Sequence, residues 1–185
     1  SASPTDSMYS YVADFNGDGW TDILVLGRVH LHQAFWYENP RGADGHWKKH
    51  FVHERVQAES PAFTDIDQDG RPEIVCIWQK QWGLVKPDWE APTEPWTFHP
   101  ISHEGGWQRF THGLGVGDVN GDGRKDLLEK DGWWEQPATL TDAPWTYHPY
   151  AFGRWGPQQG GGGGARAYVY DVNGDGLNDV VTSLE

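Results

Sequence analysis

Four short acidic segments carry the residue types and the spacing that binding of a metal ion requires. Each follows the pattern Asp-x-Asx-x-Asp-Gly-x-x-Asp/Glu, and the segments span residues 14–22, 65–73, 118–126 and 171–179. Side-chain oxygens recur at positions 1, 3, 5 and 9, and alternate residues of a tight loop can point inward at one centre. A hard cation that takes about six to eight oxygen ligands needs this density, and calcium fits best. The glycine at position 6 permits the sharp turn.

The predicted calcium ligands form four equivalent sets, one in each loop, with a backbone carbonyl at position 7 and a closing carboxylate at position 9. They are Asp14, Asn16, Asp18, Trp20 and Asp22 in the first loop, Asp65, Asp67, Asp69, Arg71 and Glu73 in the second, Asp118, Asn120, Asp122, Arg124 and Asp126 in the third, and Asp171, Asn173, Asp175, Leu177 and Asp179 in the fourth. Only the third loop also has a glutamate at position 12, Glu129, as an EF-hand has. Because β-type residues follow every loop, we interpret the EF-hand match as accidental.

Solvated Asx turns are the alternative interpretation of these loops, because Asn, Asp and Gly favour turns in any case. Four copies with the same ligand positions favour the metal. The charge agrees, since 27 acidic and 14 basic residues give a formal charge of −13, which four divalent ions would bring to −5. We therefore expect structural calcium, up to four ions, whose binding contributes to folding stability. A chain this acidic is unsuited to binding nucleic acid or an anionic membrane surface. In addition, no apolar run is long enough for membrane insertion.

The acidic loops belong to a longer repeat, because their first residues are 51, 53 and 53 positions apart. A short strand-like stretch precedes each loop and an apolar β-type run follows it. A Trp/Tyr-Glu-x-Pro element then recurs at 37–40, 89–92 and 134–137, and a Trp-x-x-His element at 47–50, 96–99 and 145–148. Four strands in about 50 residues is the size of a propeller blade. The predicted fold is all-β, with about three and a half blades of four antiparallel strands, in repeats 8–58, 59–111, 112–164 and a partial 165–185.

The four loops, together with the longer sequence segments 115–124 and 133–137, resemble FG-GAP/VCBS-type repeats, the calcium-loop repeats of integrin-like β-propellers. The resemblance implies calcium in the loop that joins the first two strands of each blade. It implies a secreted, cell-surface or periplasmic protein, in which adhesion and ligand binding are commoner than catalysis. The chain departs from the family in its number of blades, because propellers usually have about four to eight. A fragment of a longer propeller, copies joined in a ring or fibre through open blade edges, and a compact four-bladed monomer all remain open.

Other residues that could do chemistry recur once in each blade, which favours structural roles for them. The histidines His50, His99 and His148 stand at equivalent strand ends. The glutamates Glu38, Glu90 and Glu135 would lie too far apart around a ring for a glycosidase pair, which needs a separation of about 5–9.5 Å. The repeated tryptophans Trp47, Trp96 and Trp145 are interpreted as packing between blades.

A ligand site is expected on the face opposite the calcium loops, where the longer connections between blades fall. An exposed tryptophan beside polar groups can stack on a sugar ring. The sequence therefore predicts a non-catalytic calcium-binding module for a protein or glycan ligand. A self-assembling homo-oligomer and a lectin or polysaccharide-acting enzyme are the alternatives. The candidate ligand residues are Trp107, His112, Trp155 and Gln158.

Overall fold

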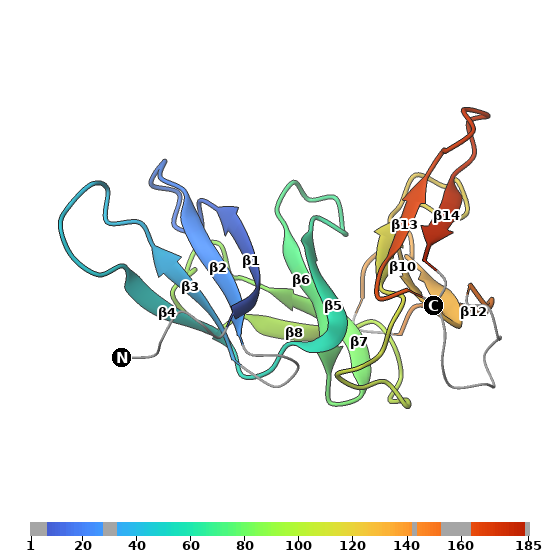
Figure 1. Ribbon diagram of the computed structural model, residues 1–185, viewed down its shortest axis with the longest axis horizontal. Helices are drawn as coiled ribbons and strands as arrows, with labels where there is room; N and C mark the ends of the chain where they lie inside the picture. The colour runs from blue at the N-terminus through green and yellow to red at the C-terminus, as the bar shows by residue number, and fades with distance from the viewer. Residues whose placement is uncertain (1–6, 28–32, 142–143, 153–163, 184–185) are drawn as a thin grey trace.

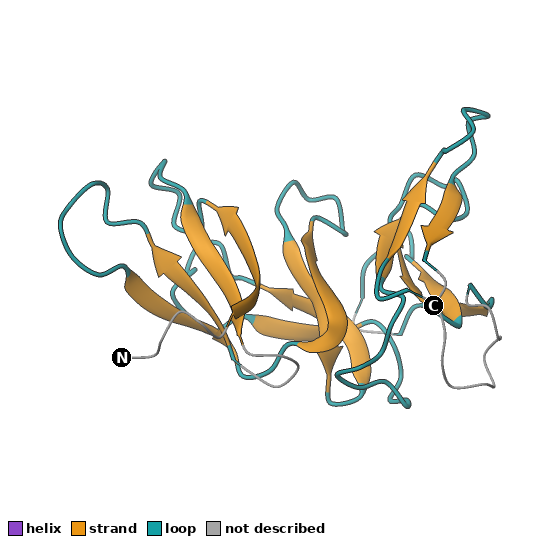
Figure 2. Ribbon diagram, in the orientation of Figure 1, coloured by secondary structure: helices purple, strands orange, loops and turns teal. Residues whose placement is uncertain are grey.

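The computed structural model describes residues 7–27, 33–141, 144–152 and 164–183. Within these ranges the chain forms fourteen strands joined by loops and turns, with no helix (Figure 2). It follows that no helix in the described ranges has the length and apolarity to cross a membrane.

The strands form four antiparallel sheets, and the pairing within each follows the order of the chain. The all-β fold of propeller-type blades predicted from the repeat is therefore confirmed. The strands are β1 (Ser7–Ala13), β2 (Asp22–Gly27), β3 (Ala34–Glu38) and β4 (Lys48–His53) in the first blade; β5 (Gln57–Thr64), β6 (Glu73–Trp78), β7 (Gln81–Lys86) and β8 (Thr97–Pro100) in the second; β9 (Gly115–Gly117), β10 (Asp126–Glu129), β11 (Gly132–Glu135) and β12 (Thr146–Pro149) in the third; and β13 (Ala167–Tyr170) and β14 (Asp179–Thr182) in the fourth.

Local sequence explains the second strands of the first two blades and the turn that follows β6. In β2 the residues alternate between buried and half-buried, as expected where one face of a strand meets the core. In β6, by contrast, all residues from Glu73 to Ile77 are buried, because this sheet has a neighbour on both faces. Gln79 and Lys80 then take φ angles of 48° and 63°, which matches the twist that a two-residue hairpin needs.

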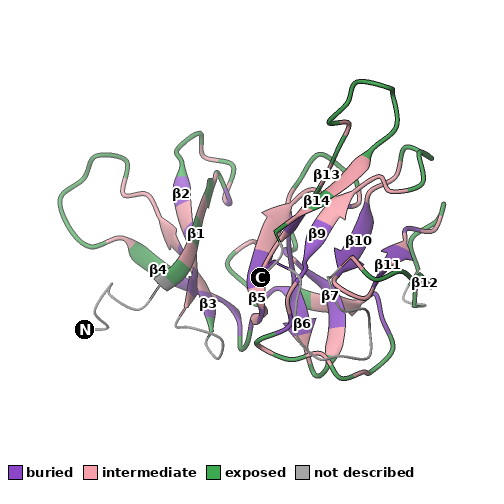
Figure 3. Ribbon diagram, turned by 45° about the vertical axis from the view of Figure 1, so that its right-hand side comes forward, coloured by how far each residue is buried: buried purple, intermediate pink, exposed green. Residues whose placement is uncertain are grey.

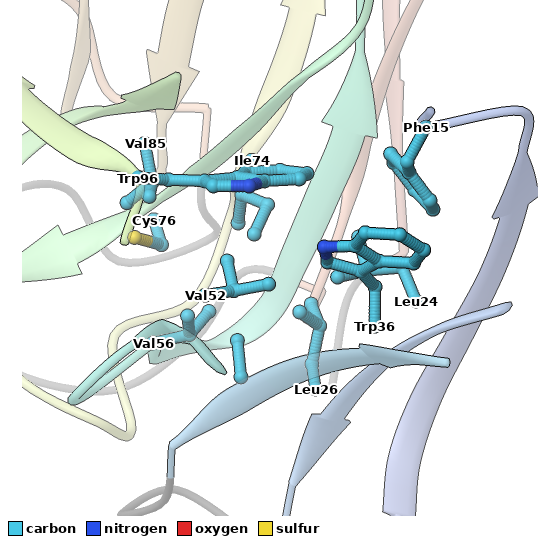
Figure 4. Close-up of a cluster of buried hydrophobic side chains, with 11 residues drawn as sticks. Phe15, Leu24, Leu26, Trp36, Val52, Val56, Ile74, Cys76, Val85 and Trp96 are labelled. Carbon is cyan, nitrogen blue, oxygen red and sulfur yellow. The ribbon is translucent and has the colours of Figure 1, made fainter. Parts of the chain in front are cut away.

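The blades stand side by side along an open arc, and the apolar cores lie between them (Figure 1). One core joins the first and second blades and contains Phe15, Trp36 and Trp96 (Figure 4). A second core joins the second and third blades and contains Trp82 and Trp134. Burial is accordingly concentrated in the strands of the second and third blades (Figure 3). Each blade is thus stabilised mainly by its neighbours.

Two of the three repeated tryptophans contribute backbone bonds to this packing. The N–H of Trp96 donates to the carbonyl of Val52, at 2.9 Å, and the N–H of Trp145 donates to that of Ile101, at 2.7 Å. In both cases the acceptor belongs to the outer edge of the preceding blade. Both indole rings are buried. The interpretation of Trp96 and Trp145 as packing between blades fits these contacts.

One part of the predicted repeat is wrong. The segment 89–92 is not the third-strand element of the second blade, because β7 ends at Lys86 and residues 89–92 form turns. Lys86 is the last residue of its strand, as Glu38 and Glu135 are of theirs. The match of residues 89–92 to the motif is therefore a coincidence within the long connection between β7 and β8. The residue equivalent to Glu38 and Glu135 is therefore Lys86, and not Glu90.

The β13–β14 hairpin is covered on one side and open on the other. Ala167 is buried, and a Cβ placed on Gly117 of β9 would lie 2.4 Å from the Cβ of Val169, so β9 and β13 pack closely. The opposite face carries Tyr168, Tyr170 and Val181, which are all exposed. Together with Val172, these residues form a surface that we call the open flank.

Candidate metal centres

All four acidic loops join the first and second strands of a blade, and in Figure 1 those of the first, second and fourth blades lie along the upper edge of the molecule. The carboxylate at position 1 folds back on the loop and accepts the N–H of the glycine at position 6. The distances are 2.7 Å for Asp14, 3.0 Å for Asp65, 2.8 Å for Asp118 and 2.8 Å for Asp171. The glycines at position 6 have φ angles of 85–88°, which side chains with a Cβ rarely adopt.

The acidic residue at position 9 is fully buried in the first three loops and holds the loop onto its blade. Both oxygens of Asp22 accept backbone N–H groups, from Phe15 at 3.0 Å and from Asn39 at 2.8 Å. Asp126 does the same with Val119 and Gln136, both at 2.9 Å. This carboxylate therefore joins the loop to the end of the third strand, a role that the sequence pattern alone did not reveal.

In the second loop this arrangement is incomplete for a chemical reason. Glu73 accepts the N–H of Ile66 at 3.1 Å. The residue that follows β7 is Pro87, which has no N–H to donate where Asn39 and Gln136 have one. The second oxygen of Glu73, Oε1, is buried without a hydrogen-bond partner. It is therefore free to bind a cation.

The four acidic side chains of the second loop converge. Asp65, Asp67, Asp69 and Glu73 each offer an oxygen, and these oxygens lie within 4.8 Å of one another. Asp65 Oδ1 is, like Glu73 Oε1, buried and without a partner. Buried polar atoms are rarely left unpaired, so two orphaned oxygens in one cluster mark a position that could hold a cation. An all-oxygen set of this kind suits calcium.

The electrostatics of the second loop also favour a cation. Burial, and then the charge of Asp67, raise the pKa of Glu73 to about 8. A nearby divalent cation would favour the charged form of this carboxylate. Burial also raises the pKa of Asp22 and of Asp126, the closing residues of the first and third loops.

In the other loops the acidic side chains are held mainly by groups of the loop itself. The carboxylate at position 5 accepts the N–H of position 7, at 2.8 Å between Asp18 and Trp20 and at 2.9 Å between Asp122 and Arg124. The same bond joins Leu177 to Asp175 in the fourth loop, and the second loop shares this one feature, between Arg71 and Asp69. The amides of Asn120 and Asn173 donate to the position-5 carboxylates of their own loops, at 3.1 and 2.9 Å. The predicted ligand residues are thus neighbours in each loop, but the acidic side chains of the second loop converge most closely among the described residues.

Basic side chains also meet these loops, and the sequence analysis missed them. Lys86 contacts Asp67 and lies 3.9 Å from Asp69. Its side chain is 26% exposed, and although burial lowers the pKa of Lys86, the hydrogen bond and charge of Asp67 raise it more. Arg41 pairs with Asp18 at 2.7 Å, and Arg124 pairs with Asp122. The sequence did contain a signal for Lys86. Pro87 comes directly after it, whereas in the first and third blades Pro40 and Pro137 come two residues after the last residue of the third strand.

Adjacent loops are also bonded to each other through position 8. Lys125 of the third loop donates to the carbonyl of Asp65 at 2.6 Å. Asn178 of the fourth loop donates to the carbonyl of Asp118 at 2.8 Å. In each case the acceptor is position 1 of the preceding loop, so the loops contribute to the contacts between blades.

The predicted ligand face is described only in part. Trp107 is half-buried, and its ring lies 5.2 Å from that of Trp134 in an edge-to-face contact. His112 is half-buried as well. Trp155 and Gln158 lie outside the described residues.

Two of the repeated histidines, those of the first and third blades, pair with the glutamates of the third strands. His50 lies 2.9 Å from Glu38 and stacks on Trp36, with 4.1 Å between ring centroids. His148 lies 2.8 Å from Glu135 and stacks on Trp133 at 4.2 Å. Each pair joins the third and fourth strands of a single blade. These contacts support the structural role expected for His50 and His148.

Comparisons with known proteins agree with a repeat protein built from propeller-type blades. Residues 4–76 match the FG-GAP-like repeat family, which confirms the resemblance over that segment. No curated protein sequence matches the chain.

Two solved structures resemble the chain in fold. The Vibrio cholerae biofilm matrix protein Bap1 has a TM-score of 0.51 at 21% identity, over 96% of this chain and 28% of Bap1. An Agrocybe aegerita lectin that specifically recognises non-reducing terminal N-acetylglucosamine has a TM-score of 0.50 at 19% identity, over 96% of this chain and 46% of the lectin. The chain thus spans less than half of either protein. At these identities the likeness concerns the fold alone.

Proposed function

We propose that the chain is a calcium-stabilised binding module, without catalytic activity, that recognises a protein or glycan partner outside the cell. The observation that carries the calcium assignment is the second loop. There, four carboxylates meet within 4.8 Å, and two of their oxygens are buried without a partner. A bound calcium ion would supply the positive charge that these oxygens lack and would cross-link the two ends of the loop.

The other three loops are proposed calcium sites by the equivalence of their positions. Each offers three carboxylates and one asparagine, together with a backbone carbonyl at position 7. Binding an ion there would require rotation of the side chains at positions 3 and 5, because in the third and fourth loops these two side chains bond to each other. Up to four ions would then lie along one edge of the arc.

The binding role is supported by the kind of protein that shares this fold. One structural neighbour is a biofilm matrix protein and the other is a lectin. Both descriptions agree with a module that acts through its surface. We propose that Trp107, His112, Trp155 and Gln158 contribute to a ligand face, and that the protein is secreted or displayed at the cell surface.

Calcium binding is tested by thermal unfolding with calcium and with chelator. We expect calcium to raise the melting temperature, because an ion that binds only the folded state at 100 times its Kd stabilises by about 2.7 kcal/mol per site. Asp65→Ala should remove part of this gain. The matched control is Asp44→Ala, because Asp44 is an exposed aspartate outside the loops. The calcium assignment fails if the melting temperature of the unsubstituted chain is the same under both conditions.

Self-assembly is the second candidate function, and the open flank favours it. Phe15 and Ile66, at position 2 of the first two loops, are 1% and 0% exposed because the next blade covers them. Val172, at the same position of the fourth loop, is 61% exposed. A blade of another copy would cover the flank as the blades of one chain cover each other.

A further inference from the structure

The second blade differs from its neighbours at two positions that the fold brings together. One is position 3 of the acidic loop, and the other is the last residue of the third strand. The first and third blades have an asparagine and a glutamate there, whereas the second blade has an aspartate and a lysine: Asn16 with Glu38, Asn120 with Glu135, and Asp67 with Lys86.

The strand registers establish that the three third-strand residues are equivalent. Two residues before the end of the strand, Trp36 pairs with His50 and Trp133 with His148. In the second blade, Leu84 pairs with His99 in the same way. Lys86 therefore stands where a glutamate stands in the blades on either side. The two exchanges together change the net charge of the pair from −1 to 0, because the added carboxylate of Asp67 is matched by an ammonium and the glutamate is lost.

The side chain of Lys86 is directed at the acidic loop. It contacts Asp67 and lies 3.9 Å from Asp69, so it reaches two of the four proposed calcium ligands. The arginines near the first and third loops differ, since Arg41 and Arg124 are each paired with one position-5 carboxylate. An ammonium and a calcium ion in the same cluster of carboxylates would repel each other strongly at this separation.

We propose that Lys86 is a resident cation of the second loop, which holds the loop together in the absence of calcium and which calcium must displace. The inference rests on the proposed function, because it concerns the regulation of a calcium site. A cavity of about 290 Å³ adjoins the pair, and Lys86 lines it together with His99, Thr141 and Trp145. This space can receive the displaced side chain.

The stability of the second blade matters most to the fold, so an internal cation has its largest effect there. This blade contributes to both apolar cores, so its loss would separate the first blade from the third. With Lys86 in place, the repulsion among the acidic side chains of the loop is reduced at low calcium. The middle of the arc then stays folded at calcium concentrations that leave the other loops empty.

The test is Lys86→Met, which keeps a long side chain and removes its charge. The control is Lys48→Met, because Lys48 is exposed and lies near Glu38 and away from the loops. Calcium titration by calorimetry should show the affinity of one site raised by about tenfold or more in Lys86→Met, and unchanged in Lys48→Met. Adding Asp65→Ala to Lys86→Met should abolish the gain, which assigns it to the second loop.

Thermal unfolding gives a second and independent readout. In chelator, Lys86→Met should melt at a lower temperature than the unsubstituted chain, and in saturating calcium this deficit should disappear or reverse. A merely structural lysine would lower the melting temperature equally under both conditions, and that result overturns the proposal. The double variant Asp67→Asn/Lys86→Glu reproduces the pair of the flanking blades, and it should also lose the resident cation and bind calcium in the second loop more tightly than the unsubstituted chain.

The calorimetric outcomes separate this inference from the proposed function. If the unsubstituted chain and Lys86→Met bind calcium identically, the role of Lys86 is overturned and calcium binding stands. If neither protein binds calcium, the proposed function is overturned, and the inference with it.

Discussion

At the scale of single residues, Pro87 and Glu73 show how one missing N–H changes the chemistry of a site. The same carboxylate position that is fully hydrogen-bonded in the first and third loops has a free buried oxygen in the second. The sequence supplied the carboxylates, but it did not reveal that a proline would leave one of them unpaired. That consequence depends on the register between the loop and the third strand.

Glu129 gives a prediction at the same scale, away from the loops. It is 2% exposed and accepts a hydrogen bond from Tyr147 at 3.2 Å. Burial, and then the charge of Asp131, raise its pKa from 4.5 to about 7. The folded state thus holds this proton more tightly than the unfolded state, so the contribution of Glu129 is fully present below pH 4.5 and is lost as the pH rises through about 7.

Glu129→Gln should therefore remove a loss of stability on the order of 2 kcal/mol between pH 5 and pH 8. The amide oxygen can still accept from Tyr147. Denaturant unfolding in saturating calcium measures the difference, with Glu104→Gln as the control because Glu104 is exposed. An unchanged pH dependence in Glu129→Gln would mean that the carboxyl titrates alike in the folded and unfolded states.

At the scale of elements, the acidic loops and the strands beside them were predictable, because their pattern is local and repeats four times. The third strand of the second blade was not. Trp89, Glu90 and Pro92 match the motif, yet the strand ends at Lys86, before them. Pro87 was a signal for the true strand end, but the loops between strands vary in length, so backbone pairing was needed to establish which residues are equivalent. For the same reason the contact between Lys86 and Asp67 could not be predicted.

The tryptophans that directly precede the fourth strands provide the test at this scale. Trp96 is 3% exposed, and its ring lies 5.5 Å from that of Phe15 in the first blade. Trp96→Ala should cost about 3–5 kcal/mol, as loss of a large buried side chain does. Trp47 is its equivalent in the first blade and is only half-buried, so Trp47→Ala should cost much less. Equal losses in denaturant unfolding would contradict packing between blades as the role of Trp96.

At the scale of the whole molecule, the open flank makes a prediction about mass. If copies associate through it, light scattering should give a multiple of 20.9 kDa. Tyr170→Lys should shift the protein towards the single-chain mass, because a charge is costly in an apolar interface. Tyr150→Lys is the matched control, since Tyr150 is 64% exposed and Tyr170 67%. A single-chain mass for the unsubstituted protein at all concentrations would remove self-assembly from consideration.

The position of the apolar cores between sheets also bears on how the chain folds during synthesis. Leu24 and Trp36 of the first blade share their core with Ile74, Val85 and Trp96 of the second. The first blade therefore cannot bury its apolar face until residue 96 has left the ribosome. Folding would trail translation by about one blade, and a pause before that residue would leave the first sheet exposed to chaperones.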